Sequence, residues 1–247
     1  MKKRPSGKSS FRDPYGFTLI EILISISIFA VLATMVYSSL NAVLSKNDAI
    51  KESVSAFEMA KSTLNRMTID LKATFVLQYP EYQVPGINDP PDSYRFYGEE
   101  SFAGAQRTSR IEFAASGHLP ISSNVVSGLA RIRYYADEGR DRKEDTLVIK
   151  RSDIPFPYDI SEQGQGAGQD TSDDPVICEH VTSFALTYID EEGQTHETWD
   201  SDSERYRFAT PRAVIIELAI AGENQVHEFM TRVAIPVYRK RLENIRR

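Results

Sequence analysis

Cysteine is nearly absent from the sequence, because Cys178 is the only one in 247 residues. A single thiol excludes an intramolecular disulfide framework and any zinc site that needs several thiolates at fixed spacing. With 13 glycines, 12 prolines and 10% aromatic residues, the chain is neither collagen-like nor disordered. Its length therefore suits one large domain or two small ones, each with room for a hydrophobic core.

Signatures of common enzymes are also missing. The sequence contains no HExxH pair, no GxSxG elbow and no Walker loop, and its four histidines are scattered, at His118, His180, His196 and His227. Cys178 and His180 stand two residues apart, which on a strand would place both side chains on one face. We favour a buried thiol beside an unrelated imidazole over a Cys–His nucleophile. The sequence therefore predicts no catalytic residues, no cofactor and no enzyme activity.

Two acidic clusters are candidates for a calcium site. They are formed by Asp200, Asp202 and Glu204, and by Asp170, Asp173 and Asp174. The first alternates in a way that superficially resembles a calcium loop, but the glycine and terminal glutamate of an EF-hand are missing. We interpret both clusters as solvated loop carboxylates and predict no metal site.

The first forty residues have an uneven charge distribution. Residues 1–16 carry five basic residues and one acidic residue, and residues 17–40 are apolar with Glu21 as the only charge. From Ile22 to Ser45 there is no charged residue, a run of 24. A helix of that length is roughly 36 Å long and crosses a hydrocarbon core of about 30 Å. No small-residue cleavage site follows the run, which predicts an anchor with its basic end in the cytoplasm.

Glu21 requires an explanation, because a carboxylate inside a bilayer costs on the order of 2.5–3.5 kcal/mol. One interpretation is that it lies one turn from the cytoplasmic edge and reaches the interface. The other is that it pairs with a cation inside an assembly. A free ammonium at Phe17, produced by cleavage after Gly16, would be such a cation.

These residues carry a family resemblance. The segment Gly16-Phe17-Thr18-Leu19-Ile20-Glu21, between a basic leader and a long apolar run, resembles the processing motif of type IV prepilins and type II secretion pseudopilins. The resemblance implies that a prepilin peptidase cleaves between Gly16 and Phe17 and that Phe17 is then N-methylated. It also implies that Glu21 pairs with the Phe17 amine of a neighbouring subunit in the filament.

The rest of the chain predicts an α+β fold. No proline occurs between Pro14 and Pro80, and apolar residues recur in steps of three and four, which predicts one helix from about Phe17 to Thr74. We expect it to cover its own sheet, with a coiled-coil dimer as the rival interpretation. Residues 78–108 are interpreted as a loop-rich insertion, and Trp199 as a core or interface anchor. Seven strands are predicted after Ser109, at Arg110–Ala114, Leu129–Ala136, Thr146–Arg151, Val181–Ile189, Gln194–Trp199, Ala213–Ala221 and Val226–Val237.

The predicted order of the chain is simple. A leader (1–16) precedes a transmembrane or filament-core helix (17–40), the periplasmic half of the same helix (41–75) and a β-rich head (76–247). With strand pairs that read ARIRYYADEG, TLVIKR and PRAVIIELAI, the whole is similar to the J-type (GspJ, PulJ) minor pseudopilins of type II secretion. That family implies a pilin-like fold, with the long helix packed on antiparallel sheet.

The resemblance also implies a function. It places the chain at the tip of the periplasmic pseudopilus, with the I, K and H minor pseudopilins and the major pseudopilin as partners, where it initiates or caps the filament for export of folded proteins. It places the anchor in the inner membrane, with the N-terminus cytoplasmic and the head periplasmic. A PilW-like type IV minor pilin, acting in pilus biogenesis, adhesion or DNA uptake, is the alternative; a signal-anchored periplasmic enzyme is a third hypothesis.

Charge separates the leader from the remainder. Removal of five basic residues and one acidic residue changes the net charge from −6 to −10. A strongly acidic product disfavours a general role in binding nucleic acid. The basic tail is interpreted as a solvated terminus, with contact to an acidic neighbour or to phospholipid headgroups as the alternative; it comprises Arg239, Lys240, Arg241, Arg246 and Arg247.

Overall fold

The computed structural model describes residues 16–86, 89–116, 128–139, 146–156, 174–222 and 225–242, without the side chains of residues 42–53. The chain divides into two units, Met1–Ile50 and Lys51–Arg247. Helix α1 (Leu19–Lys72) contributes its first part to one unit and its last part to the other. The helix predicted from about Phe17 to Thr74 is confirmed to within two residues at each end.

Both ends of α1 are capped by threonine. At the start, Thr18 Oγ1 accepts a hydrogen bond from the N–H of Glu21 at 3.3 Å, which satisfies one of the donors left free in a first turn. At the end, Thr74 Oγ1 donates to the carbonyl of Leu71 at 2.7 Å. Thr74 then forms an isolated bridge with Ala115, so the chain leaves the helix directly onto the sheet.

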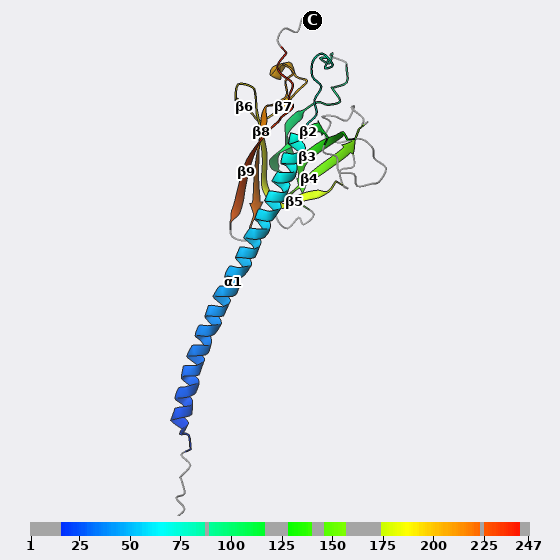
Figure 1. Cartoon of the computed structure of the whole chain (residues 1–247). Coiled ribbons are helices and arrows are strands. Elements are labelled where there is room, and N and C mark those ends of the chain that lie inside the picture. Colours follow the sequence, from blue (N-terminus) through cyan, green and yellow to red (C-terminus); the bar gives the residue numbers. More distant parts are fainter. Residues whose placement is uncertain are drawn as a thin grey trace, which may run out of the picture. The chain divides into compact units, whose positions relative to one another are not determined.

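The second unit is built on one antiparallel sheet, and the α+β pilin-like class is confirmed (Figure 1). The order across the sheet is β7-β1-β2-β3-β4-β5-β8-β9, and β6 also pairs with β5. A short 3₁₀ helix, η3 (Glu204–Tyr206), follows β7. The strands are β1 (Tyr97–Ala103), β2 (Gln106–Ala115), β3 (Ala130–Glu138), β4 (Leu147–Pro155), β5 (Val176–Ile189), β6 (Thr195–His196), β7 (Trp199–Asp200), β8 (Ala213–Ala221) and β9 (Val226–Ala234).

The segment of residues 195–200 closes one side of the sheet. Its start, β6, pairs with β5 through Tyr188 and His196, and its end, β7, pairs with β1 through Gly98 and Trp199. The sheet is therefore curled, and Ser109 Oγ of β2 accepts a hydrogen bond from the N–H of Leu186 in β5 at 3.0 Å. The strand predicted at Gln194–Trp199 is thus divided between two partners.

One prediction about the head is wrong. Residues 78–108 were expected to be a loop-rich insertion, but β1 (Tyr97–Ala103) lies within it and pairs with β2 over seven residues. The prolines that suggested a loop all precede Asp92 in the sequence, whereas the strand residues after Phe96 contain none. Pairing with β2 supplies the hydrogen bonds that local sequence does not reveal.

The last part of α1 packs on the sheet and forms the core with it. Ala60, Met67 and Leu71 have no exposed surface, and they belong to the same buried cluster as Ile111 and Ile132 of β2 and β3. Full burial of a side chain such as Leu71 contributes roughly 1.5–3 kcal/mol. The apolar stripe of the helix therefore covers its own sheet, as predicted.

A buried carboxylate links α1 to the sheet. Asp70, which has no exposed surface, accepts hydrogen bonds from Arg151 Nε at 2.8 Å and from Tyr134 Oη at 2.5 Å. It also pairs with Arg66 one turn earlier in the helix. Burial, together with the charge of Asp70, raises the pKa of Tyr134. Each charge in this cluster is neutralised or hydrogen-bonded by another member. The cluster therefore holds the helix in one register on β3 and β4.

Candidate functional site in the amino-terminal segment

The peptide bond between Gly16 and Phe17 lies just before α1. Residues 16–18 are outside the helix, and no atom of the described residues would lie within 4 Å of a Cβ added at Gly16. The Phe17 side chain is 79% exposed. This bond is therefore free of helical hydrogen bonds and open to a peptidase, as exposed non-helical segments are.

Thr18 and Glu21 together begin the helix. The spacing Thr-x-x-Glu is that of a capping box, and the Thr18 carbonyl accepts hydrogen bonds from the N–H groups of Glu21 at 3.1 Å and Ile22 at 3.2 Å. Glu21 is the acidic residue of the first turn, where the helix dipole favours negative charge. Cleavage after Gly16 would leave this start intact, because Thr18 stays on the product.

A 23-residue apolar span follows directly. Leu19–Asn41 has a mean hydropathy of 2.5 in its most apolar window, and none of that window is buried within the structure. Three of its hydroxyl groups are satisfied by the helix itself: Ser25 donates to the carbonyl of Glu21 at 2.7 Å, Ser27 to that of Leu23 at 2.8 Å and Thr34 to that of Val31 at 2.8 Å. A helix of roughly 35 Å with internally bonded polar groups can be surrounded by lipid.

The structure brings Gly16, Phe17 and Glu21 together at the start of one helix. The predicted pairing is between Glu21 of one subunit and Phe17 of another. The structure describes a single chain, so this pairing remains a prediction. The same holds for cleavage and for N-methylation.

Two acidic residues of the first cluster are held by other side chains, so the interpretation as solvated carboxylates is wrong for Asp200 and Asp202, whereas Glu204 is exposed. Asp200 receives two hydrogen bonds from Arg95, at 2.7 and 2.8 Å. Asp202 receives one from Tyr82 Oη at 3.0 Å, and its side chain is 7% exposed. Burial raises the pKa of Asp202 despite the N–H of Asp92 bonded to it.

Neither acidic cluster forms a metal site in the part of the chain that the structure describes, where no three His, Cys, Asp or Glu side chains are grouped to hold an ion. Asp170 and Asp173 lie outside the described residues. Asp174 accepts a hydrogen bond from Tyr135 Oη at 2.8 Å.

The interpretation of the basic tail as a solvated terminus is also wrong for two residues. Arg239 is 1% exposed, and its guanidinium donates to the carbonyls of Phe208 at 2.6 Å and Ser201 at 2.7 Å. Arg241 pairs with Asp190 at 3.0 Å and also contacts Glu192. Lys240 is exposed, and Arg246 and Arg247 lie outside the described residues. No local pattern indicates these contacts, because the partners are 31 to 51 positions away in the sequence.

Cys178 and His180 do not form a nucleophilic pair. The thiol is buried, and burial raises the pKa of Cys178 to about 11, which keeps it protonated and weakly nucleophilic. His180 is exposed and has a positive φ of 55° beside the irregular pairing of β4 and β5. The interpretation of Cys178 as a buried structural thiol is confirmed. The interpretation of Trp199 as an anchor in the core is also confirmed, because Trp199 is 2% exposed.

Two family models match the chain and together extend over most of it. The prokaryotic N-terminal methylation motif matches residues 12–37, which contain the Gly16–Phe17 bond, Glu21 and most of the apolar span. The type II secretion system protein J family matches residues 38–231, which include the last part of α1 and all nine strands up to the last residues of β9. No curated protein matches the chain significantly.

Proposed function

Because the chain belongs to the type II secretion system protein J family and is a minor pseudopilin, we propose that it initiates or caps the periplasmic pseudopilus at its tip. The family model covers most of the chain, which favours this role over that of a PilW-like type IV minor pilin. Pseudopilins act together, so its partners include other pseudopilins. We propose the I, K and H minor pseudopilins and the major pseudopilin as these partners, and prepilin peptidase as the processing enzyme.

The chain is anchored to a membrane by its N-terminal apolar helix. We propose that this membrane is the inner one, with the basic leader in the cytoplasm and the head in the periplasm. The basic residues that precede the span support this orientation. After processing, the helix would leave the bilayer for the core of the filament.

The observation that carries the proposal is the position of Glu21, in the first turn of an otherwise apolar helix and four residues from Phe17. Cleavage creates an ammonium group at Phe17, and methylation retains its charge. In a medium of low dielectric constant this pair attracts far more strongly than it would in water. Each subunit offers one ammonium group and one carboxylate, so the contact supports head-to-tail, open helical growth.

A structural role without catalysis forms part of the proposal. It is supported by the separation of Cys178, which is buried, from His180, which is exposed, and by the use of Asp200 and Asp202 in hydrogen bonds with Arg95 and Tyr82. Asp200 and Asp202, which were candidates for a metal site, thus serve as hydrogen-bond acceptors within the head.

The test replaces Glu21 with Val in the full-length protein expressed in membranes with the other pseudopilins. Ser25→Val is the matched control, because it adds an apolar side chain one turn later and removes no charge. We expect N-terminal sequencing to find N-methyl-Phe17 in both variants. We also expect Glu21→Val alone to lower secretion and recovery of partner pseudopilins at least tenfold. Wild-type secretion by Glu21→Val would overturn the ion-pair mechanism, and any other first residue would overturn the processing site.

A further inference from the structure

Strand β9 lies at the margin of the sheet and is paired on one side only. It pairs with β8 over nine residues, from Ala234 opposite Ala213 to Val226 opposite Ala221, without a bulge. Among the described residues no strand pairs with its other side (Figure 1). The opposite end of the strand order, β7, is only two residues long.

The hydrogen bonds at the two ends of the β8–β9 pair show which backbone groups face outward. The N–H of Gly222 donates to Gln225 at 2.9 Å, and the N–H of Ile235 donates to Arg212 at 3.0 Å. In an antiparallel ladder, hydrogen-bonded pairs alternate with non-bonded pairs. Counting from either end, Glu228, Met230 and Arg232 fall at the non-bonded positions. Their N–H and C=O groups therefore point away from β8, toward the free edge.

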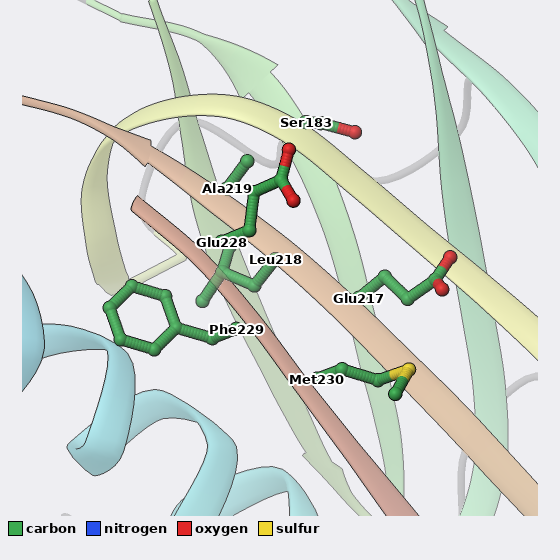
Figure 2. Close-up of a pocket in the computed structure, with 7 residues that line it drawn as sticks. All are labelled: Ser183, Glu217, Leu218, Ala219, Glu228, Phe229 and Met230. Atoms are coloured by element: carbon green, nitrogen blue, oxygen red, sulfur yellow. The ribbon is translucent and has the colours of Figure 1, made fainter. Parts of the chain in front are cut away.

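The side chains of the same three residues are exposed on one face, and Met230 is 71% exposed. Figure 2 shows Phe229 turned toward α1, where its ring lies 6.1 Å from that of Phe57, while Met230 lies away from the helix. Beside Met230 is a shallow hollow of about 490 Å³, whose lining includes Glu217, Ala219 and Glu228. The described structure gives neither glutamate an ion pair, although Glu217 and Glu228 are diagonal neighbours across β8 and β9.

This edge lacks most of the devices that normally prevent strand addition. Natural edge strands are protected by proline, by charged side chains, above all lysine, by bulges or by very short length. Strand β9 reads VHEFMTRVA, is nine residues long and has no proline, lysine or bulge, and its two charged residues, Glu228 and Arg232, are of opposite sign. A long, regular edge with an exposed methionine is a template for another strand.

The charges of β9 define what fits this edge. A strand added here places its side chains opposite those of β9 on the same face. Glu228 and Arg232 lie on either side of Met230, so the complementary strand has a basic residue opposite Glu228, an apolar one opposite Met230 and an acidic one opposite Arg232. Such pairs contribute roughly 0.2–1 kcal/mol each, and like charges directly opposite are destabilising.

A second copy of the chain can also meet this pattern. Antiparallel pairing of two β9 strands about Met230 would place Glu228 of each copy opposite Arg232 of the other. The chain is a minor pseudopilin, whose partners are other pseudopilins of the same system. We therefore take a different subunit as the occupant, and a second copy is an outcome that the test distinguishes.

We propose that the free edge of β9 receives an extended segment of a neighbouring pseudopilin, which adds a strand to the sheet. The segment alternates a basic, an apolar and an acidic residue opposite Glu228, Met230 and Arg232. The proposal rests on the function proposed above, since it takes the neighbour from the same filament.

The test uses Met230→Pro in the full-length, detergent-solubilised protein co-expressed with the other pseudopilins. Proline removes the outward N–H of residue 230 without removing a hydrogen bond to β8, a position that proline tolerates at edges. Met230→Thr is the control, because it keeps the N–H. We expect Met230→Pro to lower recovery of the bound partner at least tenfold and Met230→Thr to lower it less than threefold. Wild-type recovery with Met230→Pro would overturn the proposal.

Two further arms keep the test decisive. If Met230→Pro shifts the urea midpoint, the charge variant Glu228→Arg replaces it, and wild-type recovery with that variant also overturns the proposal. A photo-crosslinking residue at position 230 should capture another pseudopilin, whereas one at the exposed position Phe102 should not; capture of a second copy alone contradicts the choice of occupant. Normal assembly by Met230→Pro beside defective assembly by Glu21→Val would reject the edge and leave the proposed function standing. Normal assembly by both variants would reject the proposed edge contact as well as the ion-pair mechanism of the proposed function.

Discussion

The guanidinium of Arg239 lies over the ring of Tyr82, with Cζ 3.3 Å from the ring centroid. This contact joins the C-terminal segment to the loop that follows α1, more than 150 positions earlier in the sequence. The same guanidinium is 3.2 Å from Asp92 and 3.5 Å from Asp202. Burial, followed by the charge of Asp202, raises the pKa of Tyr82. A buried cation is stable here only because these groups surround it.

Replacement of Arg239 by Ala should therefore destabilise the head by about 3–5 kcal/mol, because Asp92 and Asp202 would be left as uncompensated buried charges. Lys240→Ala is the control, since the adjacent side chain is exposed, and its effect should be below about 0.5 kcal/mol. Urea unfolding followed by tryptophan fluorescence measures both, because Trp199 is in the core. Equal stability of the two variants would contradict the assigned role of Arg239.

Gly98→Ala should destabilise the head by about 3 kcal/mol or more, because the new Cβ would lie 2.0 Å from Tyr188 Oη. Tyr188 is fully buried beneath β1 and cannot move away without disturbing the core. Gly128→Ala, with no atom within 4 Å of the added Cβ, should change stability by less than about 1 kcal/mol. The difference in urea midpoint between the two alanine variants tests this, and the absence of a difference would show that β1 does not lie against Tyr188.

Cys178 should resist alkylation in the folded protein. The thiol is 1% exposed and its pKa is raised to about 11, so at about pH 8 it is both inaccessible and protonated. We expect iodoacetamide to react on the order of 100-fold faster in urea than in buffer, as measured by mass spectrometry. Ser183→Cys in a Cys178→Ala background places a thiol at an exposed position of β5 and should react at similar rates in both. Rapid labelling of native Cys178 would disprove its burial.

The stability provided by Asp190 should depend on pH. Burial by itself raises the pKa of Asp190, but hydrogen bonds from His196 and Gln194 and the charge of Arg241 outweigh it and leave the pKa below its ordinary value. A lowered pKa in the folded state means that the stabilisation is complete above the ordinary value of about 3.9 and is lost as pH falls through the folded value.

Asp190→Asn removes this charge and keeps an oxygen that can accept the Gln194 N–H, which bonds Asp190 at 2.7 Å. Urea unfolding should therefore show the wild type more stable than the variant at about pH 5, with a difference that shrinks toward about pH 2. Glu192, which also contacts Arg241, provides the matched control Glu192→Gln, whose effect should be small because that side chain is half exposed. A difference that stays constant or widens on acidification would refute the assignment.

Elements with strong local periodicity were predictable from sequence. The helix, the β3–β4 hairpin and the β8–β9 hairpin follow from periods of 3.6 and 2 and from turn residues. Strand β1 was missed because its residues, YGEESFA, alternate weakly and follow a run of prolines. The division of residues 195–200 into β6 and β7 depends on the curl of the whole sheet, which no local window contains.

The amino-terminal motif was predictable because Gly16, Phe17 and Glu21 lie within six residues and each has a chemical reason to be there. The buried charges were not. Asp202 and Arg239 look like solvated residues of a loop and a tail, and their burial depends on partners such as Asp92 and Tyr82 that are far away in sequence. Long-range compensation of charge has no periodicity, so it becomes visible only in three dimensions.

Closure of the sheet by residues 195–200 limits the strand-to-strand contacts that the head can make with other subunits. Because β6 pairs with β5 and β7 pairs with Tyr97 and Gly98 of β1, the side of the sheet opposite β9 has no edge as long as β9: it is divided between the two residues of β7 and the remaining five residues of β1. A head with two long open edges could pass strand contacts from subunit to subunit without end, as fibrils do. This head has one long, regular edge, at β9, so a strand contact of that length could not be passed on through the opposite side, as expected of a subunit that terminates a chain rather than one that extends it.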